Sequence, residues 1–279
     1  MSNKVILIVL DGLNYQAGRD CMGFTQGLCE QGLARLYKMQ CELPSMSRPL
    51  YECILTGVVP AHSGIVHNHI TRRSTQQSIF SLSRAAGKRT AAAAYHWFSE
   101  LYNRTPWDAI RDRYTHDESQ LIQHGLFYCV DSYPDCHLFN DAEHLRQQHD
   151  PDFLLIHPMN IDDAGHRAGF DSAHYRNTTR HTDMALSEYL PIWMAAGYQI
   201  LITSDHGMNT DKSHGGLLAE EREVPLWVIG DQFSFGATDP LQTELCGTVC
   251  QLLDVPHDKP LCRELLAVPR TRATTANNE

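Results

Sequence analysis

One stretch, residues 199–216 (QILITSDHGMNTDKSHGG), constrains the fold more than any other. Its apolar run, Ile200–Ile202, predicts a short buried strand that ends shortly before Asp205 and His206. His214 follows eight residues after His206. A carboxylate and two imidazoles this close together suit a transition metal such as zinc, and open α/β sheets bind ligands outside the carboxyl ends of their strands. The alternative interpretation is a polar loop with solvated or hydrogen-bonded histidines.

Composition limits the classes of function. The 279 residues suit one large α/β domain, or one with a small insertion, and 42% apolar residues are enough for a substantial core. The net charge of −10 argues against a partner such as a nucleic-acid polymer, which needs a basic face, but it leaves room for a local basic pocket. The 16 histidines favour a metal site. The nine cysteines are scattered without a CxxC pair, and they predict free thiols in a reducing compartment.

A second strand is predicted near the N-terminus. The apolar run Val5–Leu10 is too short to span a membrane, and no small-residue cleavage site follows it. We therefore expect the first sheet strand of a cytoplasmic protein without a membrane partner. Asp11 ends this run, and Gly12 lets the chain turn. Asp11 is either a turn or N-cap residue, or a second metal-binding carboxylate beside Asp205.

A serine stands at a predicted helix start. Ser47 precedes Arg48 and a probable helix over Pro49–Leu55, so it occupies the position of an N-cap. Such a serine is usually only a cap. However, a helix N-terminus also favours an oxyanion or phosphate, and a metal-bound serine there would be a plausible nucleophile.

Five motifs in a fixed order carry a resemblance to a known family. They are strand-Asp11-Gly12, Pro44-x-x-Ser47-x-Pro49, Thr56-Gly57-x-x-Pro60 with Gly64-Ile65, Asp162-x-x-Gly165-His166-x-x-Gly169, and Ser204-Asp205-His206-Gly207-Met208. The set resembles the alkaline phosphatase superfamily, most of all its type I phosphodiesterase/nucleotide pyrophosphatase branch. The resemblance implies an α/β fold, a three-layer sandwich with a mostly parallel central sheet, with a small cap insertion.

The resemblance also implies two divalent metal ions, zinc by expectation, held by six side chains. These are Asp11, Asp162, His166, Asp205, His206 and His214. Asp162, His166 and His214 would hold one ion, and the other three residues the second ion. Larger relatives take their last histidine from far beyond the DHGM motif. His214 matches relatives with a short connection, so we prefer it to His257.

The same resemblance assigns the reaction. Ser47 corresponds to the hydroxyl nucleophile, which is often threonine in this branch. Asn68 corresponds to an asparagine that holds a phosphoryl oxygen. Arg48 replaces a common aromatic residue and could add a positive contact to the substrate. The expected activity is hydrolysis of a phosphodiester or phosphoanhydride, such as a nucleotide, through a covalent phosphoserine.

Alternatives to this activity stay open. Within the superfamily they are phosphomonoester hydrolysis and phosphonate cleavage, whereas a sulfatase is disfavoured because Ser47-Arg48-Pro49-Leu50-Tyr51 lacks the final arginine of the sulfatase motif. A non-catalytic metal- or ligand-binding module is the alternative of another class. It would lack the nucleophile or a ligand, and neither is missing here.

The predicted organisation is one domain over residues 1–269, a cap or insertion over about 71–150, and a disordered tail at 270–279. Helices are expected at Gly27–Lys38 and at Asp117–Phe127. An aromatic patch over residues 95–114 is interpreted either as core packing or as a wall that stacks a base or another apolar group of the substrate.

Overall fold

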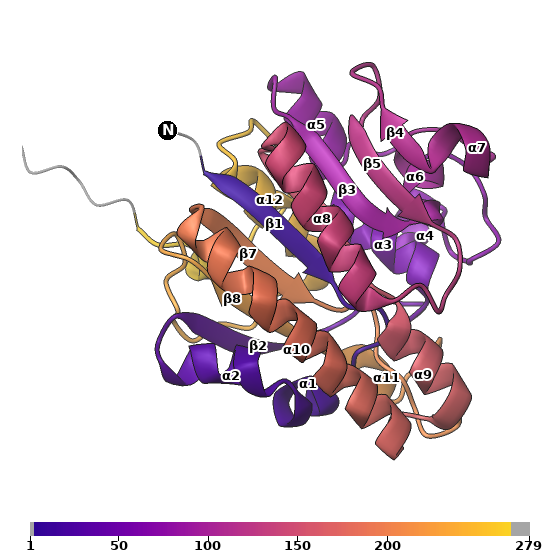
Figure 1. Ribbon diagram of the computed structural model, residues 1–279, viewed down its shortest axis with the longest axis vertical. Coiled ribbons are helices and arrows are strands. Elements are labelled where there is room, and N and C mark those ends of the chain that lie inside the picture. The colour runs from indigo at the N-terminus through magenta and orange to yellow at the C-terminus, as the bar shows by residue number, and fades with distance from the viewer. Residues whose placement is uncertain (1–2, 269–279) are drawn as a thin grey trace, which may run out of the picture.

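The computed structural model describes residues 3–268, and its centre is one eight-stranded sheet (Figure 1). The strands lie in the order β2-β8-β7-β1-β6-β3-β5-β4. Their bounds are β1 Lys4–Val9, β2 Ala34–Gln40, β3 Thr90–Tyr95, β4 Tyr114–His116, β5 His124–Tyr128, β6 Phe153–Ile156, β7 Tyr198–Thr203 and β8 Glu223–Ile229.

The centre of the sheet is parallel. β1 pairs in parallel with β6 and β7, and β3 pairs in parallel with β5 and β6. Antiparallel pairs lie toward the two edges, where β8 joins β7 to β2 and β4 pairs with β5. The central strands are apolar and buried along nearly their whole length, as expected when helices cover both faces. The predicted α/β class with a mostly parallel sheet is confirmed.

Helices form a layer on each face of the sheet (Figure 1). One core packs under α1, α2, α8 and α10, and the other under α3, α5, α6 and α12. Alternate strand residues feed the two cores, so that Ile6 and Ile8 of β1 face one layer while Val5 and Leu7 face the other. The helix bounds are α1 Tyr15–Cys21, α2 Gly23–Glu30, α3 Ser47–Thr56, α4 Pro60–Ser63, α5 Ile79–Ala85, α6 His96–Tyr102, α7 Ala109–Asp112, α8 Asp135–His149, α9 Asn160–Ala168, α10 Ala173–Ala195, α11 Ala219–Arg222 and α12 Leu245–Leu252, with short 3₁₀ turns at Gln242–Glu244 and Arg263–Leu265.

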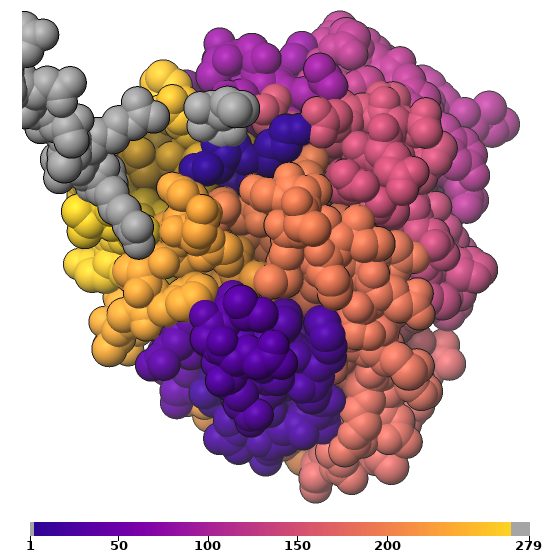
Figure 2. Space-filling model, turned by 60° about the vertical axis from the view of Figure 1, so that its left-hand side comes forward, coloured from indigo at the N-terminus to yellow at the C-terminus, as the bar shows by residue number. Residues whose placement is uncertain are grey.

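The segment after β1 differs from its predicted structure. Gly27–Lys38 is not one helix, because α2 ends at Glu30 and β2 begins at Ala34. Gly32 turns the chain at a φ of +72°, and buried and exposed residues then roughly alternate, as in a strand with one face on the core. Figure 2 shows the α1–α2 surface in indigo beside the orange surface of α10, against which both helices pack.

The segment over residues 71–150 is also corrected. It supplies β3, β4 and β5 to the sheet and α8 to one helix layer, so most of it belongs to the sandwich itself rather than to a cap. The helix predicted at Asp117–Phe127 is wrong, because His124–Tyr128 forms β5 and pairs with β3. Pairing with a neighbouring strand outweighed the local pattern there.

Two further predictions concern the C-terminal tail and whether a helix could span a membrane. The tail predicted at residues 270–279 lies outside the described residues. Within residues 3–268, none of the helices combines the length and the apolar character that crossing a membrane requires.

Candidate metal and phosphoester site

The candidate site lies where three neighbouring strands end. β7, β1 and β6 are adjacent and parallel, so their carboxyl ends meet at one edge of the sheet. Asp11 comes shortly after β1, Asp205 shortly after β7, and His157 directly after β6. The helix α9 then adds Asp162 and His166, one turn apart.

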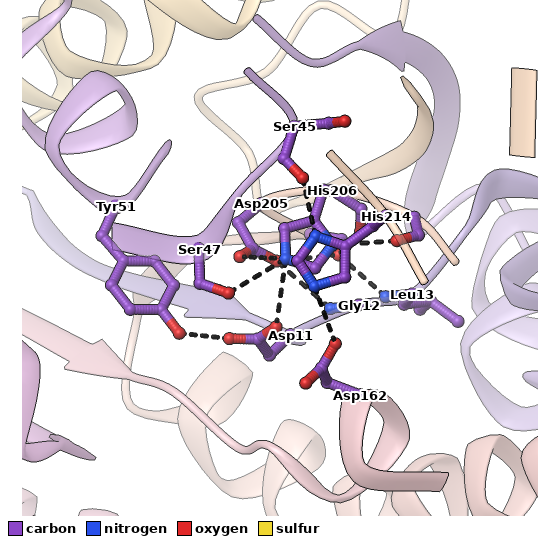
Figure 3. A network of polar contacts seen from close by, with 12 residues as sticks. Asp11, Gly12, Leu13, Ser45, Ser47, Tyr51, Asp162, Asp205, His206 and His214 are labelled. Carbon is purple, nitrogen blue, oxygen red and sulfur yellow. Dashed lines mark hydrogen bonds and ion pairs between the residues drawn. The ribbon is translucent and has the colours of Figure 1, made fainter. Parts of the chain in front are cut away.

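The N-terminus of α3 brings Ser47 to the same place. Ser47 is not the N-cap, since Met46 holds that position and Ser47 is the first helical residue. Its hydroxyl is therefore not used for capping. Instead, Ser47 Oγ lies 3.0 Å from His206 Nε2, and Figure 3 shows it pointing at the cluster of aspartates and histidines.

Three histidines turn their Nε2 atoms toward this cluster. In each ring, Nδ1 faces a backbone carbonyl oxygen: Lys212 O at 3.0 Å from His166, Gly207 O at 2.8 Å from His206, and Ser45 O at 2.7 Å from His214. A neutral ring in this position carries its proton on Nδ1, so each Nε2 presents a lone pair. His166 Nε2 and His214 Nε2 nevertheless lie 3.2 Å apart, a contact that a shared cation would make favourable.

Three buried carboxylates each keep one oxygen without a hydrogen-bond partner among the described residues. These oxygens are Asp11 Oδ1, Asp162 Oδ1 and Asp205 Oδ2. The other oxygens of Asp11 and Asp205 are held, because Tyr51 and His157 contact Asp11 Oδ2 and the Gly12 N–H donates to Asp205 Oδ1 at 3.2 Å. Buried carboxylate oxygens without a donor are strongly unfavourable unless a cation faces them.

The ligand atoms form two groups. Asp162, His166 and His214 make one, and Asp11, Asp162 and His206 make the other, with the atoms of each group within 4.8 Å of one another. Asp205 adjoins the second group, since its Oδ2 lies 3.2 Å from His206 Nε2. Imidazole nitrogens and carboxylate oxygens are ligands that zinc takes in proteins. The residues present therefore fit two divalent cations, with Asp162 facing both positions.

Burial without a countercharge shifts the pKa values of the site. Burial raises the pKa of Asp11 to about 7 and, together with repulsion from Asp11, raises the pKa values of Asp162 and Asp205 well above their usual range. Burial, with repulsion from His214, holds the pKa of His206 well below its ordinary value, and burial lowers the pKa of His214 to about 4. These two imidazoles are neutral near pH 7. Cations would favour the charged form of the carboxylates.

Two residues of the site were not found from the sequence. Tyr51 donates its hydroxyl to Asp11 Oδ2, and it lies one helical turn after Ser47 on α3, a spacing that could have revealed it. His157 Nε2 lies 3.0 Å from the same oxygen, but a single histidine at the end of an apolar run carried no signal. Both contacts orient Asp11 so that Oδ1 faces the cluster, and Figure 3 shows the contact of Tyr51.

Asn68 and Arg48, the two predicted substrate-binding residues, differ in whether their side chains are already occupied by contacts within the protein. The Arg48 N–H donates to Asn68 Oδ1 at 3.0 Å, which leaves the Asn68 Nδ2 group available to a substrate oxygen. The Arg48 side chain is buried, bonds Glu100 at 2.7 Å and lies over the Trp97 ring at 4.4 Å. Its charge is thus paired within the protein.

The aromatic patch over residues 95–114 and His257 lie outside the two ligand groups. Phe98 and Tyr102 are fully buried core residues, whereas Tyr114 is mostly exposed. Within the patch, Trp97 contacts the side chain of Arg48, the residue that follows Ser47 in the sequence. His257 lies in the turn after α12, where its Nδ1 accepts the Lys259 N–H.

The fold and the motifs that converge at this site define the alkaline phosphatase superfamily. A family model described as type I phosphodiesterase / nucleotide pyrophosphatase matches residues 5–217, and the chain belongs to that family. Its relatives are enzymes that hydrolyse or transfer phosphoesters, and members of the superfamily typically depend on divalent metals.

Two solved structures illustrate the fold. Murine ectonucleotide pyrophosphatase / phosphodiesterase 5, as an inactive variant in complex with AMP, has a TM-score of 0.72 and 16% identity, covering 95% of this chain and 100% of that chain. A phosphonate monoester hydrolase from Silicibacter pomeroyi has a TM-score of 0.66 and 14% identity, covering 97% of this chain and 78% of that chain.

Among curated proteins, the catalytic subunit of human GPI ethanolamine phosphate transferase 2 is 22% identical over 283 residues. The match covers 95% of this chain but 28% of the human protein, so the chain spans less than a third of that relative's length.

The prediction of a cytoplasmic location is wrong. Similarity to GPI ethanolamine phosphate transferases overturns it, because these relatives are named for a lipid anchor of membrane proteins. The prediction rested on the scattered free cysteines and on the apolar run Val5–Leu10 being too short to span a membrane. The nine cysteines are unpaired in the structure, but unpaired thiols do not identify a compartment.

Proposed function

We propose that this chain is a two-metal phosphodiesterase that works through a covalent phosphoserine on Ser47. The observation that carries the proposal is the position of the Ser47 hydroxyl. Its Oγ lies 3.0 Å from His206 Nε2 and beside the group formed by Asp11, Asp162 and His206. A hydroxyl among metal ligands is a suitable nucleophile, because coordination lowers its pKa.

In the proposed residue roles, Asp11, Asp205 and His206 hold the ion next to Ser47, and Asp162, His166 and His214 hold the other. Divalent ions bound there would lower the pKa of the Ser47 hydroxyl and neutralise charge on the attacking and leaving oxygens. The other contributions come from the chain itself. Tyr51 and His157 fix Asp11, and the carbonyl groups of Lys212, Gly207 and Ser45 fix the three imidazole rings.

The reaction has two steps. Ser47 Oγ, after loss of its proton, attacks phosphorus, the ester bond on the opposite side breaks, and the leaving alkoxide departs and takes up a proton. Water then attacks the phosphoserine, restores the Ser47 hydroxyl and releases a phosphomonoester. The Asn68 Nδ2 group is placed to donate to a non-bridging oxygen, since its Oδ1 already accepts the Arg48 N–H.

A diester is the proposed substrate because the basic side chain that follows Ser47 in the sequence, that of Arg48, is already paired with a carboxylate. A monoester dianion needs an additional positive contact for its third oxygen, but the Arg48 guanidinium is bonded to Glu100. The AMP complex of the murine relative supports a nucleotide-type small molecule as one substrate class to test.

Trapping of the intermediate tests the proposal. An aryl phosphodiester mixed with the zinc-loaded protein should release a rapid burst of phenolate, about one per chain, before steady turnover. Acid quenching followed by peptide mass spectrometry should find the phosphoryl group on Ser47. The Ser47→Ala protein should give neither the burst nor the adduct, and a burst with the adduct on another residue would contradict the role of Ser47.

Transfer to an alcohol instead of water is the second candidate function. The curated relatives, which are named as ethanolamine phosphate transferases, favour it. Both functions share the phosphoserine and differ only in the molecule that attacks it. Addition of ethanol or glycerol separates them. A transferase should form the alkyl phosphodiester in preference to the hydrolysis product, whereas a hydrolase should form it only in proportion to the alcohol concentration.

A further inference from the structure

Three histidines gather at the opposite end of the sheet from the candidate site. His116 is the last residue of β4, His124 is the first residue of β5, and His149 is the last residue of α8. His116 and His124 face each other in the antiparallel register of the two strands. Because the candidate site occupies the carboxyl ends of the parallel strands, a cluster at the start of β5 is separate from it.

The spacing of the three rings suits one metal ion. One ring nitrogen from each histidine lies within 4.8 Å of those of the other two. His116 Nδ1 and His124 Nδ1 are 3.3 Å apart. Two nitrogens on a tetrahedral zinc ion with bonds of about 2.0–2.1 Å are separated by about the same distance, roughly 3.3 Å.

His149 completes the cluster from the helix layer. Its ring stacks on that of His124 with centroids 3.7 Å apart and planes at 4°, and it lies 4.9 Å from the His116 ring. Parallel rings direct their lone pairs side by side, so one ring has to rotate about its side-chain torsions for all three nitrogens to converge. His149, half-buried at the end of α8, is the ring that we expect to rotate.

The surroundings of His124 resemble those of a metal ligand. Its Nδ1 faces His116, and its Nε2 lies 3.4 Å from Glu118 Oε1. Metal-binding histidines commonly donate their second ring N–H to a carboxylate, which fixes the tautomer and the ring orientation. Gln123 holds the other oxygen of Glu118 and so keeps that carboxylate in place.

The charges near the cluster are mixed. Burial and repulsion from neighbouring basic groups lower the pKa of His124 to about 4, and similar causes lower the pKa of His149. The two rings are therefore neutral near pH 7 and offer lone pairs. Arg89, which donates to the His149 carbonyl, opposes a cation, whereas Glu118 favours one.

We propose that His116, His124 and His149 form a further metal site that binds one zinc ion, with a fourth position left to water. Its role is structural. β4 is a three-residue edge strand whose sheet partner is β5, and the ion would join it to β5 and to the end of α8. Metal ions that bind only the folded state stabilise it.

Zinc stoichiometry tests this site on the whole chain. The protein is stripped with a chelator, loaded with zinc, passed through a gel-filtration column, and its zinc is measured by elemental analysis. The double variant His116→Ala/His149→Ala should retain one zinc fewer per chain than wild type, and its melting temperature should rise less on zinc addition. Its turnover of an aryl phosphodiester should be unchanged, which separates this site from the catalytic one.

His137→Ala is the matched control, because His137 is an exposed histidine of the same helix outside the cluster. It should retain as much zinc as wild type. Equal zinc in wild type and the double variant, or equal loss in the double variant and the control, would overturn the proposal. Since His116 is exposed, the single variant His116→Ala keeps the comparison valid if the double variant folds poorly.

Discussion

The Tyr51 hydroxyl donates to Asp11 Oδ2 and leaves Asp11 Oδ1 as a buried oxygen without a partner among the described residues. The bond joins the helix layer that contains α3 to the end of β1, because Tyr51 belongs to α3 and Asp11 follows β1. It makes one oxygen of the carboxylate a structural acceptor and the other a candidate metal ligand.

Loss of this hydroxyl should weaken metal binding without removing a ligand. We expect Tyr51→Phe to lower zinc affinity by about 10–100-fold, the usual effect of removing a group that orients a ligand. Competition with a chromophoric chelator measures it. Tyr102→Phe is the matched control, because its hydroxyl is also buried on a carboxylate, that of Glu52. Equal affinities of the two variants would contradict the role of Tyr51.

Removal of the nucleophile should abolish turnover while sparing the metals. Ser47→Ala should lower kcat for an aryl phosphodiester by roughly 10³-fold or more. Ser47→Thr should retain much of the activity because it keeps the hydroxyl. Steady-state kinetics and elemental analysis check both proteins. An alanine variant as active as wild type would exclude Ser47 as the nucleophile.

The zinc content of two histidine variants tests the assignment of His214, rather than His257, as the last metal ligand in the sequence. His214→Ala should lose one zinc per chain, because His214 Nε2 lies 3.2 Å from His166 Nε2 and 3.9 Å from Asp162 Oδ1. His257→Ala should keep the wild-type zinc content, since His257 contacts the backbone of its own turn. If zinc is lost from the His257 variant instead, the ligand assignment is wrong.

A buried carboxyl group outside the site gives stability a pH dependence. Asp135, at the start of α8, is bonded to Thr182 and Asn160, and burial raises its pKa to about 6. Between pH values near 4 and 6 the folded state holds a proton that the unfolded state has released, so this group makes stability fall as pH rises through that window.

Asp135→Asn removes that ionisation. Relative to wild type, the free energy of unfolding of the variant should therefore increase between pH 4 and pH 7, by on the order of 2 kcal/mol. Urea unfolding at the two pH values measures the change. If the free energies of unfolding of variant and wild type differ by the same amount at both pH values, the pKa of Asp135 is not raised in the folded protein.

The candidate site followed from the family resemblance together with local patterns that agree with it. Asp11 and Asp205 stand just after apolar runs, and parallel strands bring such positions to one edge. Asp162 and His166 are four residues apart on a helix, which places them on one face. These patterns need no knowledge of distant contacts.

The remaining features of the fold and the site depend on contacts between residues far apart in the sequence, which a local pattern does not reveal. β2 and β5 are strands because β8 and β3 lie beside them, so the predicted helices there were wrong. His157 joins the site only because β6 ends beside β1. The Arg48 side chain is paired with Glu100, which lies 52 residues away in sequence.

Anomalous diffraction at the zinc absorption edge tests the central claim most directly. Crystals of the zinc-loaded protein should show two peaks at the ends of β1, β6 and β7, about 4 Å apart. One should lie about 2 Å from ligand atoms of Asp11, Asp205 and His206, with Ser47 Oγ facing it, and the other similarly close to Asp162, His166 and His214. No peaks at this edge of the sheet, or a Ser47 hydroxyl turned away from them, would contradict the account.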